Sequence, residues 1–198
     1  MKKKGFAAIG VLGVIAVVII AFVSVYIGSY NSIVSLEQTV DEKASTIKTQ
    51  LERRADLIPN LVSTVKGYTS HEQSVIDSIT DARAAISGAS SIKELSEAND
   101  KLNSALNNLN VIVENYPNLK ADTAFVGLMD ELAGSENRIA TARTDYNEAV
   151  KDYNTKISTI PSSIVAGMMG KEKKEFFEVS NESKLEVPEV NFDTEKSE

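Results

Sequence analysis

The sequence predicts an all-α protein in which a single N-terminal transmembrane helix is followed by an antiparallel, up-and-down four-helix bundle of long helices. Two observations support this prediction: an uncharged apolar stretch near the N-terminus, and apolar residues that recur every three to four positions further on. No run of period two occurs before residue 184, so a sheet is not expected. We expect an anchor at 1–28, a bundle at 29–160, a membrane-interface segment at 161–178 and an acidic tail at 179–198.

The anchor is predicted from residues 5–28, which carry no charge and follow three lysines at positions 2–4. A helix of that length, at about 1.5 Å per residue, covers roughly 36 Å and can cross a hydrocarbon core of about 30 Å. A cleaved signal peptide has a shorter apolar region and a small-x-small cleavage site, so a retained anchor is favoured. Because the lysines precede the span and acidic residues come first after it, we expect a cytoplasmic N-terminus and an extracytoplasmic helical domain.

The charge balance argues against nucleic acid as a partner. The chain has 21 basic and 28 acidic residues, and the part beyond the anchor loses three of the lysines and none of the acids. A protein that binds phosphate backbones needs a basic patch, and the lysines at 171–174 are interrupted by Glu172. The absence of cysteine rules out disulfides and thiolate chemistry.

Four helices are expected beyond the span. The first covers 30–68, and its apolar phase continues across Pro59, which predicts one long helix with a kink. The second covers 72–86, with Ser70 as its N-cap, and the third covers 92–113. The second and third could also stack end to end, which would give three long rods.

The fourth helix is the most regular, and it ends at Pro161. A sustained seven-residue apolar spacing favours coiled-coil-like packing at a shallow crossing angle. The residues on this seam are Phe125, Leu132, Ile139, Tyr146, Tyr153 and Ile160.

Several short motifs occur in a fixed order along these helices. They are Tyr30-Asn31, Arg53-Arg54-Ala55-Asp56-Leu57-Ile58-Pro59-Asn60, Lys66-Gly67-Tyr68, Glu114-Asn115-Tyr116-Pro117, Glu131-Leu132, Glu136-Asn137, Ala142-Arg143, Tyr146-Asn147, Tyr153-Asn154 and Phe176-Phe177. The set strongly resembles the LemA family over about residues 30–192. The resemblance implies a bacterial, membrane-anchored four-helix bundle without established enzymatic activity, associated with membrane processes. Asn181-Glu182-Ser183 departs from the glutamate-glycine step expected there.

Ten residues are candidates for a structural or interaction role. They are Arg53, Arg54, Asp56, Pro59, Asn60, Glu131, Glu136, Arg143, Tyr146 and Asn147. If the first and fourth helices are antiparallel, Arg54 faces the neighbourhood of residue 133. Arg53 or Arg54 would then pair with Glu131 or Glu136 in a polar layer that fixes the register; the alternative is that all four are solvated surface charges.

The same geometry places residues 160–170 at the bilayer surface, although this run is too short to span it. We expect it to lie in the interface, with the lysines of 171–174 near lipid phosphates and Phe176 and Phe177 between headgroups. The alternative is that it only caps the open end of the bundle. For the tail, disorder is favoured over a docked strand.

No catalytic, metal or cofactor site is predicted. His71 is the sole histidine and is expected to cap a helix or lie on the surface. We therefore predict a non-enzymatic, single-pass scaffold or interaction protein of the bacterial cell membrane. Its partners would be the lipid bilayer and a membrane protein, for example a membrane protease system. The alternative is a small-ligand sensor lined by Asn60, Arg143 and Asn147.

Overall fold

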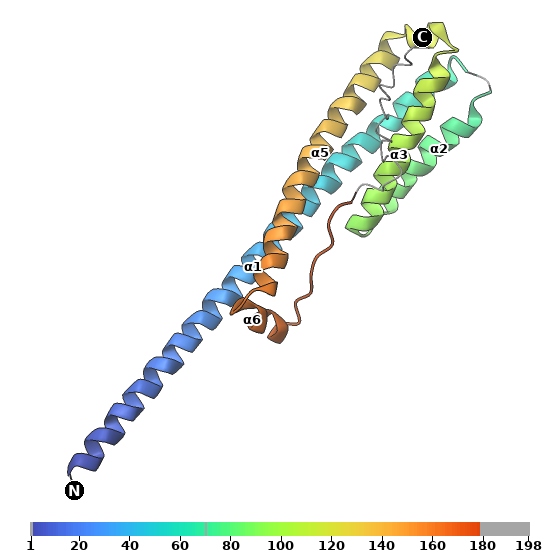
Figure 1. The fold of residues 1–198 in the computed structure, drawn as a ribbon. Coiled ribbons are helices and arrows are strands. Elements are labelled where there is room, and N and C mark those ends of the chain that lie inside the picture. Colours follow the sequence, from blue (N-terminus) through green and yellow to red (C-terminus); the bar gives the residue numbers. More distant parts are fainter. Residues whose placement is uncertain (1, 70, 179–198) are drawn as a thin grey trace, which may run out of the picture.

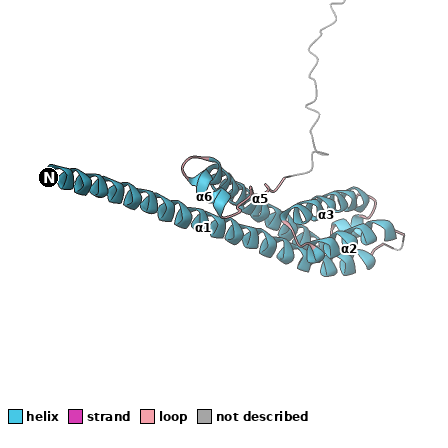
Figure 2. Cartoon of the chain, turned by 90° about the horizontal axis from the view of Figure 1, so that it is seen from below, coloured by secondary structure: helices cyan, strands magenta, loops and turns pink. Residues whose placement is uncertain are grey.

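The computed structural model describes residues 2–69 and 71–178, with side chains from residue 12 onward. Within these ranges the chain contains helices, turns and extended segments but no strand (Figures 1 and 2), which confirms the all-α class. The helices are α1 (Lys2–Lys66), α2 (Gln73–Gly88), α3 (Ile92–Val113), α4 (Pro117–Lys120), α5 (Thr123–Ser158) and α6 (Ser162–Met168).

Helix α1 joins the apolar N-terminal stretch to the folded domain without a linker (Figure 1). It continues through Pro59 as one helix, as the sequence predicts, while the kink expected there stays a prediction. Proline removes one backbone donor, but Ile58 and Leu61 on either side are fully buried and hold the helix against its neighbours. The part of α1 before Ser29 stands outside the bundle, and one stretch of it is long and apolar enough to cross a membrane.

The long helices run alternately up and down beyond the apolar stretch (Figure 1). Helix α5 packs along α1, and α2 packs antiparallel to α3; this second pair lies against the C-terminal half of α1. Because α2 and α3 lie side by side, the end-to-end alternative is wrong. Near the middle of α1 the bundle narrows to α1 and α5, with α6 at its lower end (Figure 1).

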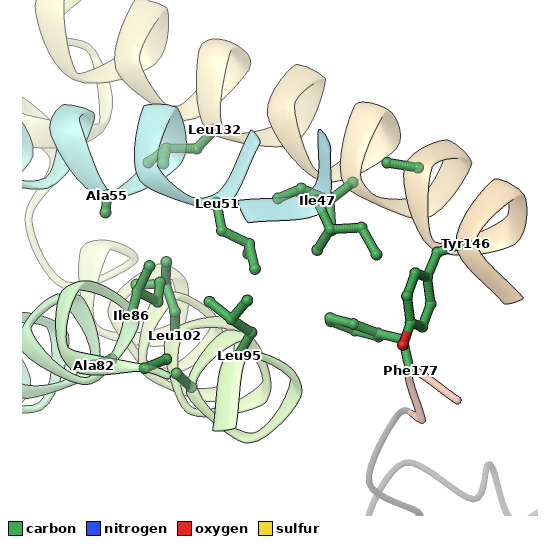
Figure 3. Close-up of a cluster of buried hydrophobic side chains, with 14 of the residues drawn as sticks. Ile47, Leu51, Ala55, Ala82, Ile86, Leu95, Leu102, Leu132, Tyr146 and Phe177 are labelled. Carbon is green, nitrogen blue, oxygen red and sulfur yellow. The ribbon is translucent and has the colours of Figure 1, made fainter. Parts of the chain in front are cut away.

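The core is formed by the apolar stripes that the sequence predicts. Figure 3 shows side chains of α1 and α5 meeting those of α2 and α3 in one cluster. The seven-residue seam of α5 lies in it, with Phe125, Leu132, Ile139, Tyr146 and Tyr153 each at most 5% exposed. Its last member, Ile160, was wrongly placed in the core: it is 83% exposed, because α5 ends at Ser158 and the chain turns away at Thr159.

Two of the helix starts have side-chain caps. Ser91 accepts a hydrogen bond from the backbone N–H of Glu94 at the start of α3, and Asp122 accepts from Ala124 and Phe125 at the start of α5. Helix α2 begins after Glu72, whose side chain makes no cap. The predicted cap at Ser70 lies outside the described residues.

Candidate functional site

A charged side chain is buried in the middle of the bundle. Arg54 of α1 is only 4% exposed. Its Nη1 donates to Oδ1 of Asn99 at 2.8 Å and to the carboxylate of Glu136, and its Nη2 donates to Oδ1 of Asn103 at 2.8 Å. The asparagines belong to α3 and the glutamate to α5, so one guanidinium joins three helices. We call these four residues the polar layer.

The electrostatics of the polar layer favour a charged arginine with fixed partners. Burial lowers the pKa of Arg54, and the negative charge of Glu136 opposes that shift. A guanidinium starts from so high a pKa that it stays protonated, so Arg54 remains a donor at every physiological pH. Its Nε and the nearby Oε1 of Gln50, one turn earlier on α1, are buried without a hydrogen-bond partner among the described residues.

The predicted charge pairing between the first and fourth helices is therefore present as the pair of Arg54 and Glu136. Arg53 and Glu131 are exposed instead and border a shallow surface depression together with Asp130 and Arg138. The sequence reasoning missed Asn99 and Asn103. On α3 they look like solvent-facing polar positions, and only the packing of α3 beside Arg54 reveals their role.

A second polar arrangement holds the chain after α6. Residues 171–178, which we call the strap, run extended back along the bundle (Figure 1). Gly170 starts the strap with φ of 65°, a left-handed conformation that favours glycine, and so lets the chain reverse after α6. Two structured segments thus follow the long helix α5: helix α6 and then the strap.

Two asparagines of α5, seven residues apart, bind the strap as a neighbouring strand would. The side-chain amide of Asn154 donates to the carbonyl of Lys174 and accepts from its N–H, both at 2.9 Å. Asn147 makes the same pair with Phe177, at 3.1 and 2.9 Å. These bonds satisfy the backbone of an extended segment that has no partner strand. The repeated Tyr-Asn pair at 146–147 and 153–154 is the sequence signal that could have predicted this contact.

Apolar and hydroxyl contacts complete the strap. The ring of Phe177 is 3% exposed and lies beside Tyr146 (Figure 3). The Tyr146 hydroxyl donates to the carbonyl of Glu175 at 2.8 Å, and Ser96 of α3 donates to the carbonyl of Glu178. Burial, together with the charges of Glu175 and Asp41, raises the pKa of Tyr146 to about 12, so that it acts as a neutral donor.

The lower part of the strap is held by charge. Lys171 Nζ lies 2.6 Å from a carboxylate oxygen of Glu37, and Lys174 Nζ lies 3.7 Å from Glu37 and 3.5 Å from Asp41. The burial of Phe177 corrects one expectation: this ring packs into the core instead of entering lipid headgroups, because Asn147 and Tyr146 hold the strap against α5. The position of Lys171 and Lys174 near lipid phosphates stays a prediction.

The remaining candidates are dispersed. Asp56, Pro59 and Asn60 are exposed on α1, and Arg143 is half-buried on α5. Asn60 and Asn147, proposed as the lining of a ligand site, are not brought together: one faces solvent and the other binds the strap. Within residues 2–69 and 71–178, no group of three or more His, Asp or Glu side chains is arranged to hold a metal ion.

The asparagine contacts give a testable prediction for the strap. Changing Asn147 and Asn154 together to alanine removes four hydrogen bonds to the strap backbone and leaves peptide groups of Lys174 and Phe177 without partners. We expect faster trypsin cleavage in the strap, followed by mass spectrometry of the fragments. Asn137→Ala, at an exposed position of the same helix, is the control and should leave the cleavage rate unchanged. Equal rates for both variants would contradict the asparagine contacts.

The Glu37–Lys171 pair predicts a pH dependence. The hydrogen bond from Lys171 is the main cause that lowers the pKa of Glu37 in the folded chain. A lowered carboxyl pKa stabilises the fold above the ordinary glutamate value, and this contribution is lost as the pH falls through the lowered value. We therefore expect Glu37→Gln to be less stable than the parent at pH 7, with a difference that shrinks on acidification. Urea unfolding measured at several pH values tests this, and a pH-independent difference would contradict it.

The fold and the two polar arrangements define a class: a helical domain built on the same continuous helix as an N-terminal apolar stretch, with its helices joined by a buried arginine. The sequence model of the LemA family matches residues 43–192, so the chain belongs to the LemA family. The described part of that range contains the polar layer, α6 and the strap.

Individual relatives agree with this assignment. The chain is 26% identical to magnetosome protein MamQ 2 of Paramagnetospirillum magneticum over 204 residues, covering 89% of this chain and 75% of the relative. It is 25% identical to MamQ of Magnetospirillum gryphiswaldense, covering 80% and 68%. It is also 25% identical to protein LemA of Metamycoplasma hominis, covering 87% and 77%. None of these names denotes an enzyme.

Proposed function

We propose that this protein is a single-pass membrane protein whose helical domain serves as a non-enzymatic interaction module for other membrane proteins. The observation that carries the proposal is the N-terminal part of α1. The large aliphatic and phenylalanine side chains between Leu12 and Ile27 are 46–70% exposed. A surface of this kind is stable in lipid and unstable in water.

The proposed orientation has a cytoplasmic N-terminus and an extracytoplasmic domain. It is supported by the lysines at positions 2–4, compared with Glu37, Asp41 and Glu42, which are the first charges after the span. Because the chain contains no cysteine, Lys48→Cys provides a single labelling site at an exposed position of the domain. A membrane-impermeant maleimide should label this variant in intact cells. Labelling only after the cells are lysed would show that the domain faces the cytoplasm, opposite to the proposed orientation.

The interaction role is supported by how α1 presents the domain. The apolar stretch and the domain share one helix, so the exposed faces of α1, α3 and α5 are held at a fixed position relative to the membrane. Such an arrangement suits contact with neighbouring membrane proteins. Two of the relatives are named as magnetosome proteins, and we extend to this chain a role in a protein assembly of this kind.

Photo-crosslinking in membranes tests the interaction role. A photoreactive residue is placed singly at Arg53 of α1, Lys101 of α3 or Glu131 of α5, all of which are exposed. We expect reproducible adducts with a small set of membrane proteins from one face of the domain. Adducts with no protein from any of the three faces would overturn the interaction role and leave the anchor unaffected.

A further inference from the structure

The lower end of the bundle carries exposed apolar side chains that packing within the chain does not explain. We call residues 159–170 the foot; it comprises the turn after α5 and helix α6. Ile160, Ile164 and Met168 follow one another at intervals of four residues and are 83%, 61% and 71% exposed. These are values expected of polar surface residues, and three large apolar side chains so close together form a patch.

The foot is nonetheless an ordered part of the fold. Ser162, Val165 and Ala166 are buried, and α6 packs against both α1 and α5. The N–H of Lys171 donates to the carbonyl of Ala166 at 3.0 Å and closes the end of the helix. The exposed side chains are therefore presented by a fixed segment.

The foot lies where the exposed apolar part of α1 ends. The Ser162 hydroxyl is 3.4 Å from that of Ser29, and Ser29 is buried whereas Ile27 is 52% exposed. The rings of Tyr26 and Tyr30 stack at this level, with centroids 6.4 Å apart. Tyrosines gather at membrane–water interfaces, where one end of the side chain is apolar and the other is wet.

Charge is absent from the described chain segments at this level. Residues 5–36 and 157–170 contain no charged side chain, and the first charges beyond them are Glu37, Lys156 and Lys171. The ion pair of Lys171 with Glu37 marks the boundary. From Ser29 to Glu37 a helix rises about 12 Å, so this uncharged layer has about the depth at which interfacial helices bury their apolar side.

We propose that the foot is a lipid-binding surface, in which Ile160, Ile164 and Met168 enter the boundary between headgroups and acyl chains beside the span. The proposal rests on the membrane anchor of the preceding section and adds a second contact between the domain and the bilayer. Lipid is the occupant because the patch adjoins the apolar surface of α1, shares its lack of charge, and ends where paired charges begin. The domain then sits on the membrane surface and is not raised above it on a stalk.

Fluorescence quenching by lipid measures this directly. The full chain, with one cysteine introduced and labelled with bimane, is reconstituted in phosphatidylethanolamine–phosphatidylglycerol vesicles that contain doxyl lipids. Met168→Cys reports on the foot. Val111→Cys is the matched control, because Val111 is also 71% exposed but lies at the far end of α3. Val18→Cys reports on the span itself.

We expect the probe at position 168 to lose about half its fluorescence with a quencher near the headgroup, and less with a quencher near the chain end. The probe at 111 should be unaffected, and the probe at 18 should respond most to the deep quencher. If the probe at position 18 is quenched and the probe at 168 is unaffected like that at 111, the membrane anchor is supported and the proposed lipid-binding foot is wrong. If the labelled probe at position 168 is not quenched and the unlabelled Met168→Cys chain forms intermolecular disulfides, the patch binds a second copy and the proposal is also wrong. If the probe at position 18 is not quenched, the proposed membrane anchor is wrong, and the proposed lipid-binding foot, which depends on it, is wrong as well.

Discussion

Arg54→Met should destabilise the helical domain by about 2–4 kcal/mol, because it removes a buried side chain that bonds α1, α3 and α5 together and leaves Asn99, Asn103 and Glu136 without this donor. Methionine keeps most of the volume and the helix propensity of arginine, so the loss reports mainly on the polar contacts. Urea unfolding of the full chain in detergent micelles, followed by circular dichroism, measures the difference in the free energy of unfolding.

The chain supplies a matched control in the neighbouring arginine. Arg53 is exposed, and Arg53→Met should change the free energy of unfolding by less than about 0.5 kcal/mol. A double-mutant cycle with Glu136→Gln isolates the ion pair: the double variant should be more stable than the separate effects together predict. Two results would contradict a stabilising role of Arg54: additive effects of Arg54→Met and Glu136→Gln on the free energy of unfolding, or an equal loss of stability in Arg53→Met and Arg54→Met.

Phe177→Ala should cost about 3 kcal/mol and release the strap, since this ring is 3% exposed and packs beside Tyr146 in the core. A strap without its apolar contact depends on side-chain hydrogen bonds to the backbone and on ion pairs near the surface, which are weaker. The same unfolding measurement gives the stability change. Trypsin cleavage at the lysines of the strap reports its release.

The adjacent phenylalanine is the control for this experiment. Phe176 is 44% exposed, so Phe176→Ala should cost less than about 1 kcal/mol and leave the cleavage rate near that of the parent. The pair also discriminates between the two accounts of this segment. Burial of Phe177 in the core predicts a large stability loss in micelles, whereas insertion of both rings among headgroups predicts similar and small losses for the two variants.

The helices could be predicted from the sequence because apolar spacing alone determines which face of each is buried. The sequence predicts the third helix with its observed bounds, because apolar residues recur at helical spacing between Ile92 and Val113. The pairing of Arg54 with Glu136 could also be predicted, because an antiparallel arrangement of α1 and α5 fixes which residues face each other.

The strap could not be predicted in the same way. Its residues have no helical or strand period, and it is held by Asn147, Asn154 and Tyr146, whose bonds go to backbone groups 20–30 residues away. A side chain that bonds to the backbone places no requirement on the residue type it contacts, so the strap sequence carries no trace of it. Ile160 is a case in which the apolar spacing misleads. It continues the seven-residue spacing of α5, but the helix ends at Ser158, before this residue.

The unbroken course of α1 has a mechanical consequence. From Ser29 to Lys66 the helix extends about 55 Å beyond the apolar stretch as one continuous helix. A change of about 10° in the tilt of a membrane span, well within the range that bilayer thickness imposes, would swing the far end of the domain sideways by about 10 Å. Thinning or thickening of the surrounding bilayer would thus appear as a lateral displacement at Lys66, many lipid diameters above the site where it arose.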